Sequence, residues 1–402
     1  MERLISLLGL ITFVGIAYAF SVNRKAIRWR TVLWGIGLQL FFALFILRTS
    51  LGFALFKFLG DRVNDFLNFA DVGSAFVFGE NFKEHFFAFK ILPTIIFFSA
   101  CITLLYHYGI LQRVVQGIAW VMMRTMKTSG AESLSSAANI FVGQVEAPLL
   151  IKPYIAAMTN SELHAVMTGG FATIAGGVLA AYISFGIPVE HLLSASVMSA
   201  PASLAVSKVL YPETEKSSTA GKIEINGESP YINAIDAITS GAIEGLKLAL
   251  NVAAMLIAFL GLVAFLNAVL GWMGSWVGIS SLSLELILSY IMAPIAWLMG
   301  VPWADAEAVG MLLGKKTILN EFIAYLDLKQ LIENQAISPR SVVIATYALC
   351  GFSNLGSIAI QIGGISAIAP DRQGDLARLG VRAMFAGSIA CFMTACIAGL
   401  LL

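Results

Sequence analysis

The amino-acid sequence predicts an all-α polytopic membrane protein with inverted repeats, and three observations support this fold class. Of the 402 residues, 58% are hydrophobic and only 12% are charged, which is the composition of a membrane protein. Two apolar segments carry charged residues and prolines that lipid does not tolerate, and a glycine-rich span follows each of them. The loops that are expected in the cytoplasm after the first and third spans are rich in Lys and Arg.

The N-terminal part of the chain predicts three spans, at residues 4–22, 32–47 and 87–110. A basic cluster at residues 24–30 follows the first span and should stay in the cytoplasm, so the N-terminus is predicted outside. A cleaved signal peptide is the alternative, because Ala17-Tyr18-Ala19 resembles a peptidase site, although the cations lie on the wrong side of the apolar run. Residues 53–82 are predicted to be an external interfacial segment.

After the third span the chain returns to the cytoplasm, where an amphipathic stretch punctuated by Arg113, Arg124 and Lys127 should lie flat in the headgroup region. Residues 135–158 and 302–328 then predict re-entrant hairpins packed within protein. A charged side chain at the bilayer centre costs at least ~2.5–3.5 kcal/mol, so neither segment should face lipid.

The order of hairpin, interrupted helix and helix occurs twice. The interrupted helices are predicted at residues 163–187 and 342–368, and the helices after them at residues 192–210 and 379–402. Gly-Phe-Ala-Thr-Ile-Ala-Gly, which begins at Gly170, aligns without gaps over Gly-Phe-Ser-Asn-Leu-Gly-Ser, which begins at Gly351. One long apolar run between the copies, at residues 235–270, inverts the second copy. Inverted repeats with hairpins and broken helices are typical of secondary transporters, whereas glycine-rich helix packing and a chance alignment are the alternative.

These features predict about eight transmembrane helices plus two hairpins, with both termini outside. The chain is divided into residues 1–110 (three helices, scaffold), 111–210 (first repeat), 211–300 (linker, long helix and interfacial segment, scaffold) and 301–402 (second repeat). Residues 280–298 are predicted either as an interfacial helix or as a ninth crossing.

Glu146 and Glu321 occupy equivalent places in the two hairpins, and inversion should bring the hairpin tips together near the midplane. Such an acid could bind a cation, carry a proton or accept hydroxyl donors. The alternative is an ion pair within each hairpin, of Glu146 with Lys152 and of Glu321 with Lys316 or Lys315.

Neutral oxygens beside the first helix break suit a small hard cation such as sodium. They come from Asn139, Thr173 and backbone carbonyls, and helix-to-helix hydrogen bonding is the alternative for both side chains. Phe352, Asn354 and Ser357 should line the same cavity from the second break. An aromatic face beside an amide and a hydroxyl suits a ligand with an apolar part and a polyhydroxylated part, although core packing also explains Phe352.

The sequence argues against several other classes of function. It contains no phosphate-binding glycine loop, no zinc-ligand spacing and no Asp-rich magnesium pair, so a membrane-embedded enzyme is a weak rival. A channel is the second rival. The chain has 25 Lys and Arg against 24 Asp and Glu, which gives no reason to expect a nucleic-acid partner.

Three segments resemble the signatures of the concentrative nucleoside transporters. They are residues 139–148, residues 314–325 and Gly351-Phe352-Ser353-Asn354. The second of them fits the family pattern of Gly or Ala, any residue, Lys, three residues and Asn-Glu-Phe-Val-Ala, with Ile323 in place of Val. The resemblance implies a bacterial inner-membrane homotrimer that is not an enzyme, in which a transport domain moves like an elevator against a scaffold and imports nucleosides with sodium, or with protons as some members do.

The resemblance also implies roles for individual residues. Gln144 and Glu146 should face the nucleobase, with Val178 nearby. Glu321, Asn354 and Ser357 should bind the ribose hydroxyls, with Phe352 beside it. The side chains of Asn139 and Thr173 and the carbonyls of Val142 and Ile174 should hold sodium. Val145 stands where bacterial relatives often have Thr, which could narrow base recognition, whereas Thr173 in place of Ser keeps its oxygen.

Overall fold

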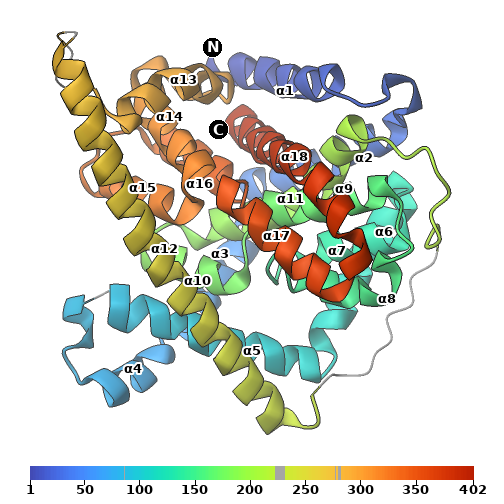
Figure 1. Cartoon of the computed structure of the whole chain (residues 1–402), viewed down its shortest axis with the longest axis horizontal. Coiled ribbons are helices and arrows are strands. Elements are labelled where there is room, and N and C mark those ends of the chain that lie inside the picture. Colours follow the sequence, from blue (N-terminus) through green and yellow to red (C-terminus); the bar gives the residue numbers. More distant parts are fainter. Residues whose placement is uncertain (86, 222–230, 277, 279–281) are drawn as a thin grey trace.

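The computed structural model describes residues 1–402 except 86, 222–230, 277 and 279–281. Within that part of the chain every regular element is a helix, which confirms the predicted all-α class (Figure 1). Seven of these helices, or up to eight if one bent pair is counted as a span, are long and apolar enough to cross a membrane. The predicted span at residues 342–368 is not among those seven, and its second part, Leu355–Ile368, is a shorter apolar helix.

The N-terminal part forms six α-helices together with short 3-10 and π-helical turns. They are α1 (Glu2–Ala19), α2 (Trp29–Arg48), α3 (Ser50–Leu67), α4 (Ala70–Phe78), η3 (Phe87–Ile91), α5 (Leu92–His107) and α6 (Ile110–Met126). The predicted interfacial segment is therefore helical, as α3 and α4. In α6 the buried residues Leu111, Val115, Ala119, Met122 and Met126 recur every three or four positions, so the predicted amphipathic helix is present.

The two repeats have the predicted order of elements. The first contains α7 (Gly130–Ala138), η4 (Ala147–Ile151), α8 (Lys152–Ile155), α9 (Asn160–Ala172), α10 (Gly176–Ser184) and α11 (Val189–Leu210). The second contains α14 (Trp303–Ile318), α15 (Glu321–Glu333), α16 (Pro339–Leu349), α17 (Leu355–Ile368) and α18 (Gln373–Leu401). Both helix breaks fall in the glycine-rich stretches. The return arm of the first hairpin is short, because Pro148 and Pro153 each lack a backbone donor.

Between the repeats lie α12 (Ala234–Trp276) and α13 (Leu284–Leu298). The axis of α14 is turned by 118° from that of α13, and the two helices pack against each other. The ambiguous segment at residues 280–298 is thus helical from Leu284 onward, and its first two residues lie outside the described part.

The helices pack in two groups. The long helix α12 lies along α5, whereas α1 and α2 pack on α11 and α18 (Figure 1). Gly241 and Gly245 permit the close approach of α12, because a Cβ at these positions would lie 2.6 Å from Thr103 Oγ1 and 2.7 Å from Ile96 Cα. In these contacts α1 and α2 therefore pack in a different group of helices from α5.

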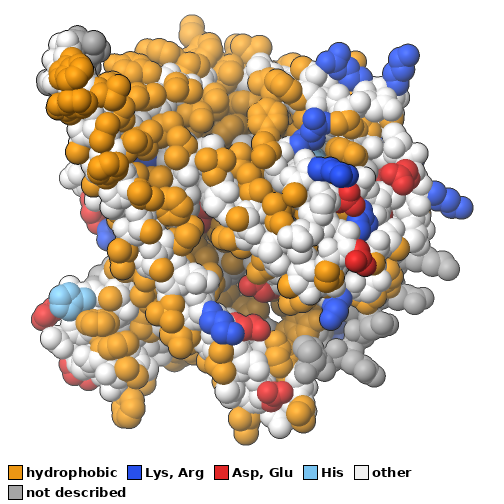
Figure 2. Space-filling model, in the orientation of Figure 1, with side chains coloured by type: hydrophobic (Ala, Val, Ile, Leu, Met, Phe, Trp, Pro, Cys, Tyr) orange, Lys and Arg blue, Asp and Glu red, His pale blue; other side chains and the backbone are white. Residues whose placement is uncertain are grey.

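Hydrophobic side chains cover much of the face formed by α12, α13 and α14, and this face is hollowed between α12 and α17 (Figure 2). Only 6% of the most apolar window of α12 is buried within the chain. Such a helix needs lipid or other protein around it, because an apolar surface of this length is unfavourable in water.

A buried ion pair ties the base of the first hairpin to the helices around it. Lys208 Nζ of α11 lies 2.6 Å from Glu132 Oε2 of α7, and these side chains are only 8% and 3% exposed. The same ammonium group donates to Ser161 Oγ of α9 at 2.8 Å and lies 3.7 Å from Glu213 Oε2. Three elements of the first repeat thus share one charged contact.

Lys208→Met should lower the free energy of unfolding by about 3–5 kcal/mol, because it leaves buried carboxylates without their cation. The measurement is the thermal unfolding midpoint of the purified protein in detergent. Arg62→Met is the matched control, since Arg62 and its partner Asp65 are 63% and 57% exposed and such a pair contributes less than about 1 kcal/mol. Equal midpoints for the two variants would contradict a stabilising role for the Lys208 contact.

Candidate functional site

The two broken helices meet at their breaks. The backbone N–H of Phe352, between α16 and α17, donates to the carbonyl of Thr173, between α9 and α10, at 3.1 Å. Gly351 allows this contact, because a Cβ there would lie 2.7 Å from the carbonyl oxygen of Phe171. The tip of the first hairpin also reaches the first break, since a Cβ at Gly176 would lie 2.6 Å from the carbonyl oxygen of Phe141. The breaks and this hairpin tip therefore form one centre.

Glu321 is the first residue of α15 and is only 4% exposed. Its Oε1 accepts a hydrogen bond from the Tyr182 hydroxyl at 3.0 Å, and its Oε2 accepts from Asn354 Nδ2 at 3.1 Å. A carboxylate at a helix N-terminus is also stabilised by the helix dipole. The structure thus gives Glu321 two neutral donors from two other elements.

Within the described part of the chain, the two neighbouring lysines contact other groups and do not form the alternative ion pair with Glu321. Lys315 Nζ lies 2.7 Å from Asp327 Oδ2 and 3.5 Å from Glu285 Oε1. Lys316 is 1% exposed and donates to the carbonyl of Ala348, at the end of α16, at 2.8 Å. Lys316 therefore satisfies a backbone acceptor that the second helix break leaves free.

Asn354 links the second hairpin to the first. It is the N-cap of α17, and its Oδ1 accepts from Ser357 N at 2.8 Å. Ser357 Oγ in turn accepts from Gln144 Nε2, in the first hairpin, at 3.3 Å. Gln144, Asn354 and Ser357 are 7%, 3% and 3% exposed. A continuous chain of polar contacts therefore runs from Gln144 to Glu321 through the start of α17.

The remaining residues that were predicted to face a ligand lie around this chain. Val178 of α10 is buried, Phe352 and Val145 are half-buried, and Glu146 is exposed. Val145 packs against α17 where Gly364 leaves room for it. The two acids thus differ in their surroundings, since Glu321 is buried and accepts from Tyr182 and Asn354, whereas Glu146 is exposed.

The predicted sodium ligands offer neutral oxygens beside the first break. Asn139 is 1% exposed, and its Nδ2 donates to the carbonyl of Ser135 at 3.0 Å, while its Oδ1 has no hydrogen-bond partner among the residues that the structure describes. The Thr173 hydroxyl donates to the carbonyl of Gly169 at 2.8 Å, which leaves its lone pairs available. A Cβ at Gly169 would lie 3.2 Å from Asn139 Nδ2, so Asn139 packs against the last turns of α9.

The backbone carbonyls at this position are also available. Val142 and Ile174 lie outside the helices, and no backbone hydrogen bond found in the described part of the chain ends on either carbonyl. A buried amide oxygen without a partner is costly unless something binds it. Asn139, Val142, Thr173 and Ile174 therefore fit a sodium ion, which prefers oxygen ligands. Among the described residues no group of three His, Cys, Asp or Glu could hold a transition metal.

Sequence reasoning missed two buried polar residues that contact the predicted ones, Tyr182 of α10 and Gln361 of α17. Gln361 is 0% exposed, and its Nε2 donates to Gln144 Oε1 at 3.0 Å and to the carbonyl of Met167 at 3.1 Å. Gln361 follows Ser357 by one helical turn in an otherwise apolar segment, and this spacing is a signal that could have identified it. Tyr182 offers no such signal.

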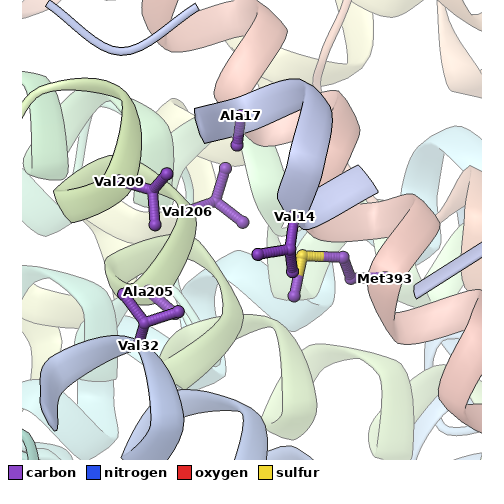
Figure 3. Close-up of a pocket in the computed structure, with 7 residues that line it drawn as sticks. All are labelled: Val14, Ala17, Val32, Ala205, Val206, Val209 and Met393. Carbon is purple, nitrogen blue, oxygen red and sulfur yellow. The ribbon is translucent and has the colours of Figure 1, made fainter. Parts of the chain in front are cut away.

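An apolar crevice elsewhere in the chain is not a second candidate. It lies between α1, α2, α11 and α18 and is lined by Val14, Ala17, Val32, Ala205, Val206, Val209 and Met393 (Figure 3). It shares no residue with the polar chain described above. A polar ligand would find no hydrogen-bonding side chain among these residues.

Three family descriptions cover most of the chain. "Na+ dependent nucleoside transporter N-terminus" matches residues 8–81, "Nucleoside recognition" matches residues 88–189, and "Na+ dependent nucleoside transporter C-terminus" matches residues 191–399. The last of these alone spans more than half of the sequence.

Curated relatives and solved structures agree with these matches. The chain is 49% identical to "Solute carrier family 28 member 3" of Homo sapiens, over 100% of this chain and 60% of that protein, and 47% identical to "Sodium/nucleoside cotransporter 1" of Mus musculus, over 100% and 64%. It thus spans about 60% of the length of these relatives. None of them is described as an enzyme.

The structure of CNTnw in an inward-facing substrate-bound state is 41% identical, covers 100% of this chain and 98% of its own, and superposes with a TM-score of 0.95. A CNTnw variant in an outward-facing state is 40% identical over 100% and 98%, with a TM-score of 0.94.

Gly170→Ala should destabilise the protein by about 1–3 kcal/mol. A Cβ at Gly170 of α9 would lie 2.7 Å from Gln361 Nε2 and 2.9 Å from Gln144 Cβ, so both side chains would have to move. Gly177→Ala in α10 is the control, because its Cβ would meet no atom closer than 3.5 Å, and Ala is the better helix former. Thermal unfolding should rank the first variant below, and the second at or above, the unaltered protein, and the reverse order would contradict this packing.

Proposed function

We propose that this chain, which belongs to the Na+-dependent concentrative nucleoside transporter family, imports nucleosides across a membrane together with a cation. The observation that carries the proposal is the chain of hydrogen bonds from Gln144 through Ser357 and Asn354 to Glu321. It connects both hairpins through the start of α17, so one ligand placed along it could contact both repeats.

The substrate side chains are assigned by the chemistry of a nucleoside. Glu321, Asn354 and Ser357 present acceptors and donors that can exchange their mutual hydrogen bonds for bonds to the ribose hydroxyls. Phe352 and Val178 supply apolar contact beside the sugar and the base. Gln144, Val145 and Glu146 lie on the first hairpin, where they would meet the base edge. The family resemblance implies these roles, and the structure supports them because the residues lie close to one another.

Sodium is the proposed coupling ion. Its ligands would be the side chains of Asn139 and Thr173 and the carbonyls of Val142 and Ile174. Val142 is two residues before Gln144, so an ion held there would fix the tip of the first hairpin and order the base-binding side chain. Proton coupling remains the alternative.

The proposed transport cycle moves one group of helices past the other, as an elevator. The contact of α12 with α5, and the contacts of α1 and α2 with α11 and α18, support a cycle in which α5 and α12 are the fixed scaffold and α1 and α2 move with the repeats. The exposed apolar length of α12 supports a homotrimer in which copies meet at the scaffold. We further propose a bacterial inner-membrane location with external termini, from the Lys and Arg after the first and third spans.

Glu321→Gln should raise the KM for nucleoside at least about 100-fold, because charge-assisted hydrogen bonds to the hydroxyls are lost. The amide also replaces one of the two acceptor oxygens by a donor, so it cannot accept hydrogen bonds on separate oxygens from both the Tyr182 hydroxyl and Asn354 Nδ2, as the carboxylate does. Uptake of labelled uridine and adenosine into proteoliposomes measures the change.

Glu333→Gln is the matched control, since Glu333 ends the same helix and its side chain is 60% exposed. It should leave uptake unchanged. Both variants should assemble like the unaltered protein by size-exclusion chromatography. Normal uptake by Glu321→Gln would refute the substrate site.

Thr173→Val should raise the sodium concentration for half-maximal uptake about tenfold, as expected for the loss of ~1.4 kcal/mol of ion binding. Thr173→Ser keeps the oxygen and should behave like the unaltered protein. Uptake is measured with an inward sodium gradient, an inward proton gradient, or neither.

Accumulation against a concentration gradient with sodium alone supports a sodium symporter and argues against a channel, which cannot concentrate its solute. Accumulation with protons alone would keep the transport function but refute the sodium site. If no nucleoside accumulated under any gradient, the transport function itself would be wrong.

A further inference from the structure

Gln361 contacts the proposed base-binding residue without belonging to the predicted site. It lies on α17, is 0% exposed, and its Nε2 sits between Gln144 Oε1 at 3.0 Å and the Met167 carbonyl at 3.1 Å. We infer that Gln361 is a positioning residue that fixes the orientation of the Gln144 amide, and so sets which groups of the nucleobase the site accepts. This inference rests on the proposed nucleoside transport.

The orientation of Gln361 follows from its backbone partner. The Met167 carbonyl can only accept a hydrogen bond, so the amide nitrogen of Gln361, and not its oxygen, must face it. The second N–H of the same nitrogen then donates to Gln144 and requires the oxygen of the Gln144 amide at that position. A backbone carbonyl of α9 thereby determines the orientation of two side-chain amides in series.

Gln144 consequently presents its nitrogen to the site. Its Nε2 donates to Ser357 Oγ at 3.3 Å, and its second N–H remains for a ligand. Because the oxygen of Gln144 faces Gln361, the side chain turns its amide nitrogen, and so a donor, toward the base. It should therefore select bases with a carbonyl oxygen or a ring nitrogen lone pair at the facing position, and discriminate against analogues that have C–H there.

The stability of the fold does not explain a glutamine at position 361. Its Oε1 is buried and has no hydrogen-bond partner in the described part of the chain. An unsatisfied buried acceptor destabilises a protein, and an apolar side chain of similar size would avoid this cost in an apolar helix. A Cβ at Gly170 would lie 2.7 Å from Gln361 Nε2. The glycine at this position of α9 therefore leaves room for the Gln361 amide.

The test replaces Gln361 by Met, which keeps the size and removes the donors. Gln361→Met should raise the KM for the transported nucleoside roughly five- to tenfold and change the maximal rate less than about twofold. Gln39→Met is the matched control, because Gln39 of α2 is also 0% exposed and neither of its side-chain polar atoms has a partner within the described residues. It should leave the KM unchanged.

A double-mutant cycle distinguishes positioning from general support of the fold. If Gln361 acts through Gln144, then Gln144→Met alone and Gln144→Met with Gln361→Met should have the same KM within about twofold. Competition by analogues that each lack one acceptor on the base, such as deaza-purine nucleosides, gives a second measurement. The unaltered protein should discriminate against at least one of them, and Gln361→Met should lose that discrimination.

Additive effects in the cycle, or a Gln361→Met variant with unchanged KM and unchanged discrimination, would overturn the inference while leaving nucleoside transport intact. Failure of the unaltered protein to take up any nucleoside would instead overturn the proposed function, and this inference with it. Thermal unfolding of each variant checks that a change in KM does not come from a misfolded protein.

Discussion

The structure depends on hydrogen-bond partners for the backbone N–H and C=O groups of two helices, which break where no water is expected. Inside a bilayer an unpaired N–H or C=O is costly, so an interrupted helix requires partners for the groups that it releases. Here the breaks pair with each other, through the bond from Phe352 N to the Thr173 carbonyl. Once the two breaks are joined, the hairpin tips and the starts of α10 and α17 have little freedom in where they lie. The candidate site is built on this junction.

The two repeats satisfy their remaining acceptors differently, despite their common order of elements. At the end of α16 the chain supplies its own donors, since Lys316 donates to the Ala348 carbonyl and the Tyr325 hydroxyl donates to the Thr346 carbonyl at 2.7 Å. At the end of α9 the Asn139 oxygen and two free carbonyls have no donor among the described residues. A mobile cation could complete the first break, whereas a tethered ammonium group already completes the second.

The sequence predicted those parts of the fold that depend on local chemistry. Glycine runs placed both breaks, and acids within apolar segments placed both hairpins, because lipid excludes such residues wherever they occur. Contacts between repeats were harder to foresee. Tyr182 is far from Glu321 in the chain and has no periodic partner. Lys316, one of the two alternative ion-pair partners for Glu321, instead donates its hydrogen bond to a carbonyl of α16. The grouping of α1 and α2 with α11 and α18 likewise depends on tertiary packing, which no local pattern records.

The geometry divides the proposed site into a rigid end and an open end. Glu321, Asn354 and Ser357 are nearly fully buried and hold one another by hydrogen bonds, and Tyr182 supports the carboxylate. Groups fixed before binding lose little freedom when a ligand replaces their mutual bonds, so this end should recognise one invariant chemical group. Glu146 is exposed and Val145 half-buried, so the other end can adapt to different partners.

A nucleoside has this division into a constant and a variable part, because its ribose is constant and its base varies. Among the residues proposed to meet the base, Gln144 is the exception, since its amide orientation is fixed from α9 through Gln361. Discrimination between bases should therefore depend on that one amide more than on the residues around it.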